Sequence, residues 1–175
     1  MGILVFLLLT AQVIDRVAVV VGNTVITETE VVQEARLEAF LNQAPLDLGP
    51  ETRKTTADRL VNQQLVRNEM KIGAYPEPTD AQVESALKRF RQEHFNSIPA
   101  YRASLEKYGI TEDQLKRHLK WQLAAIEFTD QRFNTGEPSG ANRAAPGATD
   151  DPFEAWLKQA RSQTKIQFKQ GAFQQ

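Results

Sequence analysis

The sequence predicts a mainly α-helical fold with a small antiparallel sheet, formed by an N-terminal hairpin and a C-terminal strand. Two β-rich runs flank Gly22-Asn23, and several later segments repeat apolar residues at helical spacing. A short segment with alternating apolar residues, "KIQFK", follows the last helical pattern. With 175 residues, 41% of them hydrophobic and 25% charged, the chain is long enough to bury a core.

The hairpin is predicted in "RVAVVVGNTVITETE". Its strands are Val17 to Val21 and Thr24 to Ile26, and Gly22-Asn23 tolerate the positive φ of a two-residue turn. Because the first strand is apolar at every position, it needs cover on both faces or a further strand beside it.

Two helices are expected next. Thr27 to Glu30 fit a capping box that opens the first, which ends at Ala44-Pro45. The second runs from Glu51 to Gly73, where glycine can take a left-handed stop conformation. The predicted buried positions are Val31, Ala35 and Ala39 in the first helix and Ala57, Val61, Leu65 and Ile72 in the second.

Three more helical patterns follow the break at "YPEPT". Capping boxes at Thr79 and Thr111 open the first and the last of them, and the last reaches about Phe133. Between them a short helix over Pro99 to Tyr108 stops at Gly109. The apolar stripes are Val83, Leu87, Phe90 and His94, then Tyr101 and Leu105, then Leu115, Leu119, Leu123 and Ile126 beside Trp121, Ala125 and Phe128.

Residues 134–151 have the composition of a flexible linker, because Gly, Ser, Ala and Pro dominate and no periodic apolar residue occurs. Asp151 then caps a helix that starts at Pro152. We expect Lys165 to Phe168 to join the hairpin as a third strand, since a lone strand is not stable. The alternative is a homodimer in which this terminal helix and strand are exchanged between subunits. The stripe of the helix is Phe153, Trp156, Leu157 and Ala160.

Composition and motifs exclude several classes of function. The 21 Lys and Arg against 22 Asp and Glu give a net charge of -1, which provides no field for binding nucleic acid. The chain has no cysteine, and its two histidines, His94 and His118, lack partners at metal-ligand spacing. No phosphate-binding, dinucleotide or nucleophile motif is present. The sequence predicts no catalytic residue, no metal and no cofactor.

The apolar run from Ile3 to Leu9 resembles the hydrophobic part of a secretion signal, although no positive residue precedes it. We interpret residues 1–11 as the remnant of a signal peptide. A hydrophobic N-terminal strand or tail and a short membrane anchor are the alternatives. The run is shorter than the ~20 residues that a membrane span requires.

The candidate binding residues are apolar and mostly aromatic. The hypothesis is that part of this set lines an open groove between helices that holds an extended polypeptide. The alternative is that the same residues form an ordinary helical core. The set is Phe90, Phe95, Tyr101, Leu105, Trp121 and Phe128.

Three segments resemble SurA-type periplasmic chaperones in their order along the chain. "VIDRVAVVVGNTVITETEVVQEARL" is similar to the start of that family, a valine-rich hairpin that leads into a helix. "YRASLEKYGITEDQLKRHLKWQLAAIEFTDQRF" resembles its later N-terminal helices, and "FEAWLKQARSQTKIQF" resembles its closing helix and strand. The resemblance implies a chaperone core over residues 12–133, completed by residues 152–175.

The family's usual chain places one or more parvulin-type prolyl isomerase domains where this chain has only residues 134–151. The resemblance therefore implies an ATP-independent chaperone, or holdase, without that domain and not an enzyme. Its partners are expected to be unfolded exported or outer-membrane proteins in the periplasm or cell envelope. A structural or assembly subunit whose apolar face is permanently occupied is the main alternative, and a peptidyl-prolyl isomerase is another.

Overall fold

A computed structural model describes residues 15–133, 151–169 and 171–173 of the chain. The expected signal-peptide remnant and all of the expected linker except Asp151 lie outside these residues. The described part holds six helices and three strands, so the predicted fold class is confirmed. The strands are β1 (Val17–Val21), β2 (Thr24–Thr27) and β3 (Ile166–Phe168), and the helices are α1 (Glu28–Leu41), α2 (Pro50–Ile72), α3 (Asp80–His94), α4 (Ile98–Tyr108), α5 (Glu112–Phe133) and α6 (Pro152–Gln163).

The sheet has the order β2-β1-β3 and is antiparallel throughout. The apolar strand β1 is central, so the further strand expected beside it is present. β3 pairs Ile166 with Val21 and Phe168 with Val19, so the predicted third strand is confirmed. This pairing lies within one chain, and exchange between two subunits stays a prediction.

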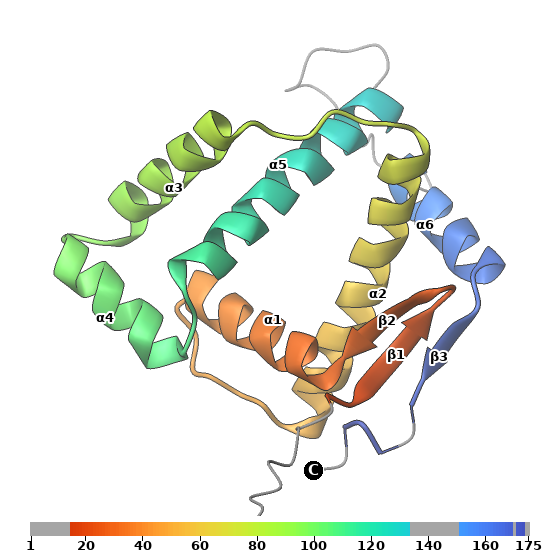
Figure 1. Cartoon of the computed structure of the whole chain (residues 1–175), viewed down its shortest axis with the longest axis horizontal. Coiled ribbons are helices and arrows are strands. Elements are labelled where there is room, and N and C mark those ends of the chain that lie inside the picture. The colour runs from red at the N-terminus through yellow and green to blue at the C-terminus, as the bar shows by residue number, and fades with distance from the viewer. Residues whose placement is uncertain (1–14, 134–150, 170, 174–175) are drawn as a thin grey trace, which may run out of the picture.

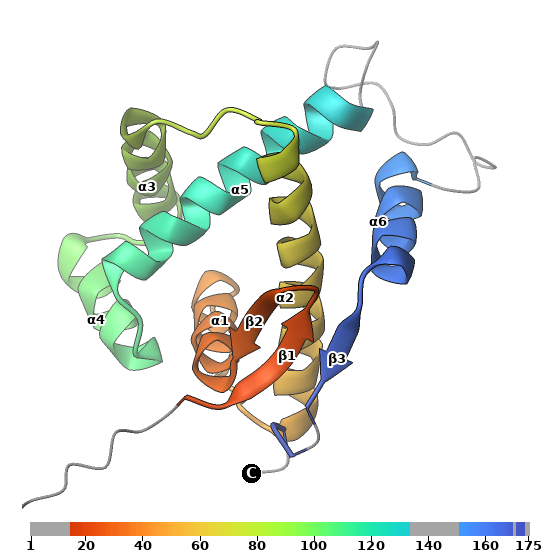
Figure 2. The ribbon, with the colours of Figure 1, turned by 45° about the vertical axis from the view of Figure 1, so that its right-hand side comes forward.

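The first core cluster joins the two ends of the chain. It packs the buried face of the sheet against α2 and α6, and Figures 1 and 2 show α6 and β3 beside α2 and β1. Arg161 of α6 donates 2.6 Å to the Asp58 carboxylate of α2 and also contacts Asn62. The buried residues of the cluster are Ala18, Val19, Val21, Ile26, Val31, Ala57, Val61, Leu65, Leu157 and Ala172.

The second core cluster lies on the side of α1 where α3, α4 and α5 gather (Figure 1). It is rich in aromatic rings: Phe40 contacts Phe90, Phe95 and Tyr108 with centroid distances of 5.7, 5.8 and 5.9 Å. Such edge and offset contacts stabilise aromatic clusters beyond the effect of burial alone. The sheet is thus connected to the outer helices through α1 and α2.

The predicted helix starts are confirmed at all four sites. The hydroxyl groups of Thr27, Thr79 and Thr111 each accept a hydrogen bond from the backbone N–H of the residue three positions later. The side chain of that later residue accepts in turn from the backbone N–H of the threonine. Asp151 accepts from the backbone N–H of Phe153 at 3.0 Å. The predicted stop at Gly109 is also confirmed, with a φ of 65°.

Several predicted details of the helices are wrong. Gly73 has a right-handed conformation, with φ of -79°, and the left-handed position is taken by Ala74 at φ 51°. A Cβ atom at residue 73 would lie 2.5 Å from the Tyr75 ring. Glycine therefore suits this position because the ring approaches the backbone closely, and not because of its φ angle. Ile72 and Ile126, both placed on apolar stripes, are 82% and 61% exposed, and His94, placed on the stripe of α3, is exposed as well.

Candidate functional site

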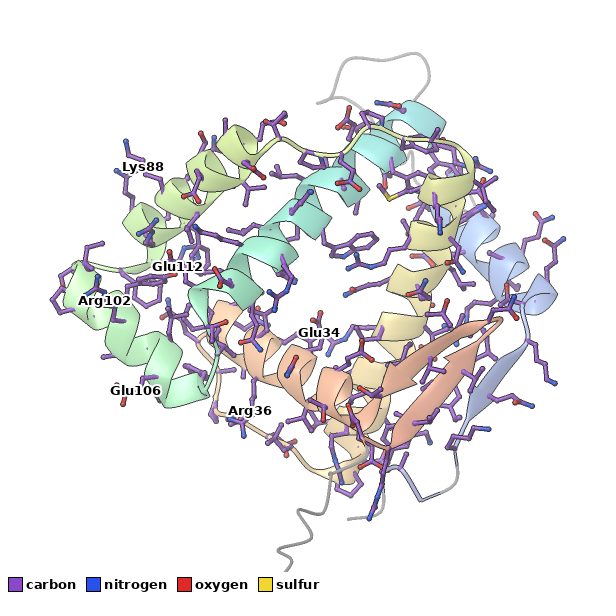
Figure 3. The ribbon with its side chains drawn as sticks, viewed as in Figure 1. Glu34, Arg36, Lys88, Arg102, Glu106 and Glu112 are labelled. Atoms are coloured by element: carbon purple, nitrogen blue, oxygen red, sulfur yellow. The ribbon has the colours of Figure 1, made fainter. Side chains whose placement is uncertain are left out.

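A cleft of about 870 Å³ lies between α1, α2 and α5, with β2 along one side. Figure 3 shows Glu34 of α1 at the opening that these helices frame. The segment after α2 closes part of the rim through Tyr75, Glu77 and Pro78. The cleft is therefore bounded by one strand and three helices, and its lining is drawn from distant parts of the sequence.

One face of α2 forms the longest wall. Leu60, Gln64, Arg67 and Lys71 follow at steps of three and four and all line the cleft. The row rises about 16 Å along the helix, which equals about five residues of an extended chain. This wall changes from apolar near the sheet to cationic toward the end of α2.

Arg67 meets Trp121 across the cleft. The guanidinium carbon lies 4.1 Å from the centre of the indole ring, within the range of a cation–π contact. Arg67 makes no ion pair among the described residues. Burial lowers the pKa of Arg67, and the negative charge of Glu34 opposes this effect. At the rim, by contrast, Lys120 donates 2.8 Å to Glu77 and the two charges neutralise each other.

His118 presents an unsatisfied polar atom beside the cleft. Its Nε2 is buried and has no hydrogen-bond partner among the described residues. Burial lowers the pKa of His118 and the charge of Arg67 acts in the same direction, whereas the charge of Glu34 opposes them. Glu34 itself accepts from the Gln63 amide at 3.1 Å. A neutral imidazole with a free nitrogen thus lies next to the cationic wall.

The structure separates the predicted binding residues into three places. Only Trp121, which is half-buried, lines the cleft. Phe128 is fully buried between Tyr75 and Trp156, with ring centroids at 5.0 and 5.7 Å. The other four, Phe90, Phe95, Tyr101 and Leu105, meet in the second core cluster, where Tyr101 and Leu105 are buried and the two phenylalanines half-buried.

Sequence reasoning did not single out most residues of the cleft. Gln63, Gln64 and Arg67 lie on a polar face that a helix normally turns to solvent, so periodicity alone gives no reason to select them. Val25 belongs to a predicted strand, but its position on the sheet edge depends on the tertiary pairing. His118, which has no partner at metal-ligand spacing in the sequence, also lines the cleft, and its Nε2 is buried without a hydrogen-bond partner among the described residues.

The described residues contain no group of three or more His, Cys, Asp or Glu side chains that is arranged to hold a metal ion. Among the described helices, none combines the length and apolar character that crossing a membrane requires.

Comparison with known proteins gives one informative similarity. Over 150 residues, which cover 78% of this chain, the sequence is 25% identical to a protein named Chaperone SurA from Dechloromonas aromatica (strain RCB). The chain spans about a third, 34%, of the length of that relative. No family model matches the sequence. The similarity suggests a SurA-like region with a chaperone-like domain.

Proposed function

We propose that this chain is an ATP-independent holdase that binds unfolded exported or outer-membrane proteins in the periplasm or cell envelope. The similarity to Chaperone SurA over 78% of the chain is the observation that carries the proposal. The helical fold, with a sheet that joins both ends of the chain, agrees with the resemblance of the hairpin and of the closing helix and strand.

The cleft is the surface that we propose for client binding. Unfolded chains expose apolar side chains and unpaired backbone groups together, and a surface for them needs both apolar and polar contacts. The cleft offers Leu37, Leu60 and the Trp121 ring beside the amides of Gln63 and Gln64. Its size lies within the range of pockets that enclose small ligands, and it is open enough to admit a longer segment.

We propose a second client-binding surface, which is secondary to the cleft. Phe90 and Phe95 are half-buried against the second core cluster, and Ile98 at the start of α4 is 48% exposed. These side chains are able to hold an aromatic or aliphatic residue of a client without disturbing the buried Tyr101 and Leu105. We propose that Tyr101, Leu105 and Phe128 position these surfaces and do not themselves contact a client.

The test is suppression of aggregation. An unfolded outer-membrane β-barrel protein is diluted from urea with and without the chain, and light scattering is followed. We expect scattering to fall as the chain approaches molar equivalence. Unchanged scattering at several-fold molar excess of chain would instead support a structural or assembly subunit.

We also propose that the chain is not a prolyl isomerase. Rotation about an amide crosses a barrier of ~18–20 kcal/mol, and lowering it requires an enclosed, preorganised site. The cleft has exposed residues in its walls, such as Val25 at 45% exposure, and His94 is exposed on α3. A protease-coupled assay on an Xaa-Pro peptide should show the uncatalysed rate. An acceleration that His118→Gln abolishes would contradict this proposal.

A further inference from the structure

One residue of β2, Val25, directs its backbone N–H and C=O groups away from the sheet. Ala18 of β1 accepts from Lys169 at 2.9 Å and Gly22, directly after β1, donates to Lys165 at 2.9 Å, so both residues bond toward the β3 segment. Since alternate residues of a central strand bond to opposite neighbours, Val20 also bonds toward β3. Val25 lies opposite Val20, and its N–H and C=O are therefore directed away from β1.

Among the described residues no further strand pairs with this edge of β2, which borders the cleft. Val25 is 45% exposed and lines it together with Thr24 and Ile26. The next residue with outward groups, Thr27, already donates its N–H to the Glu30 carboxylate at 2.7 Å and begins α1. The edge can accordingly accept one residue pair of an added strand, and an unpaired edge of this kind is a template for an extended chain.

The charges of the cleft are divided between its walls. Glu30 and Glu34 are on α1, where each already accepts a hydrogen bond, from Thr27 and Gln63 respectively. The opposite walls, α2 and α5, carry cationic groups without an ion pair among the described residues. These groups are Arg67, Lys71 and Arg117.

Arg67 is prepared to bind a carboxylate. Its guanidinium face lies on Trp121, which restricts the side chain and leaves the N–H groups at the guanidinium edge free for a bidentate contact. The partnerless Nε2 of His118 in the same lining is a second polar atom without a ligand. A buried polar atom of this kind is uncommon in folded proteins and marks a place where an occupant can supply the missing bond.

We infer that the cleft binds an extended polypeptide segment that carries an acidic side chain. The segment pairs its backbone with Val25 on the β2 edge and places a carboxylate against Arg67 on its Trp121 platform. This inference rests on the proposed function and adds a preference to it: among unfolded segments, those with Glu or Asp in an extended, β-prone context bind best.

The experiment uses the full chain with Trp156→Phe, so that Trp121 is the remaining tryptophan and reports on the cleft. The probes are the capped peptide Ser-Val-Thr-Glu-Thr-Val-Ser, the same peptide with Gln replacing Glu, and the Glu peptide N-methylated along its backbone. We expect the Glu peptide to bind about ten-fold more tightly than either of the others, because each loses one of the two contacts.

Two substitutions show whether Arg67 is responsible. Arg67→Gln should bring the Glu and Gln peptides within about two-fold of each other. Arg102→Gln, which changes a cation on the outer helix α4 (Figure 3), should leave the ten-fold preference intact. Circular dichroism of both variants is the control that tests whether they are folded.

Any of the following results would overturn the inference that the cleft prefers an acidic segment. Equal affinity for the three peptides, or a preference that survives Arg67→Gln, would show a general holdase with no acidic preference, and the proposed function would stand. Binding of no peptide together with unsuppressed aggregation would remove the proposed function as well. A dimer of the peptide-free chain that Arg67→Gln dissociates would assign the cleft to a second copy of the chain.

Discussion

The rings of Phe133 and Phe153 lie 5.7 Å apart, centroid to centroid, with an interplanar angle of 80°. Phe133 is the last residue of α5 and Phe153 is in the first turn of α6. The chain thus leaves the helical core and returns to it at one place. This geometry suits an insertion point, because described residues of the core contact both ends.

We predict that replacement of residues 135–150 by a Gly-Ser segment of equal length leaves the fold unchanged. The expected shift of the melting temperature is within about 2 °C, since none of the described contacts of α6 depends on the replaced residues. Thermal unfolding followed by circular dichroism measures it. A loss of folded structure would show that residues 135–150 are part of the core.

Removal of the Trp156 side chain should destabilise the chain strongly. Its ring contacts Phe128, Phe133 and Phe153 at 5.7 to 6.0 Å, and Arg132 lies over it at 5.8 Å. A buried aromatic residue cut to alanine costs ~3–5 kcal/mol, and this half-buried one should cost about 2–4 kcal/mol. Denaturant unfolding gives the value.

Trp121→Ala is the matched control for Trp156→Ala. Trp121 lines the open cleft and contacts Arg67, whereas Trp156 packs in an aromatic cluster. Trp121 is also half-buried but contacts no other aromatic ring among the described residues, so its loss should cost less than that of Trp156, about 1–2 kcal/mol. Equal destabilisation by the two substitutions would contradict the docking of α6 as described.

Stability should fall as the pH decreases below the ordinary histidine pKa of 6.5, because burial lowers the pKa of His118 in the folded chain. The unfolded chain then binds a proton that the folded chain does not, which favours unfolding through the pH range between the two pKa values. His118→Gln should remove this part of the pH dependence. Denaturant titrations between pH 7.5 and pH 5.5 measure it, and removal by His94→Gln instead would contradict the account.

Local signals in the sequence predicted the elements of this fold well. The three threonine capping boxes and the Gly22-Asn23 turn depend on contacts within a few residues, and all appear in the structure. The alternation of Ile166 and Phe168 predicted a strand correctly, but Phe168 is 40% exposed and not on a buried side. The third strand followed from a simple requirement, that a lone strand at the C-terminal end needs a partner and the hairpin is the other predicted β-segment.

The candidate site was less predictable because it depends on contacts between distant helices. The aromatic residues chosen for binding were mostly those that the core also selects, such as Tyr101 and Phe128, which are fully buried. Arg67 and Trp121 are separated by more than fifty residues, and only the packing of α2 and α5 brings them together. Neither amphipathic periodicity nor residue type distinguishes such a pair from a solvated helix face.

The most direct test of client binding in the cleft is site-specific photo-cross-linking. A photoreactive residue is placed at Gln64 inside the cleft, at Phe95 on the second proposed surface, or at Lys88 on the outer face of α3 (Figure 3), and unfolded outer-membrane protein is added. We predict strong cross-linking from Gln64, weaker cross-linking from Phe95 and almost none from Lys88. Equal yields from Gln64 and Lys88, or a product from Lys88 alone, would contradict the central claim that the cleft holds the client.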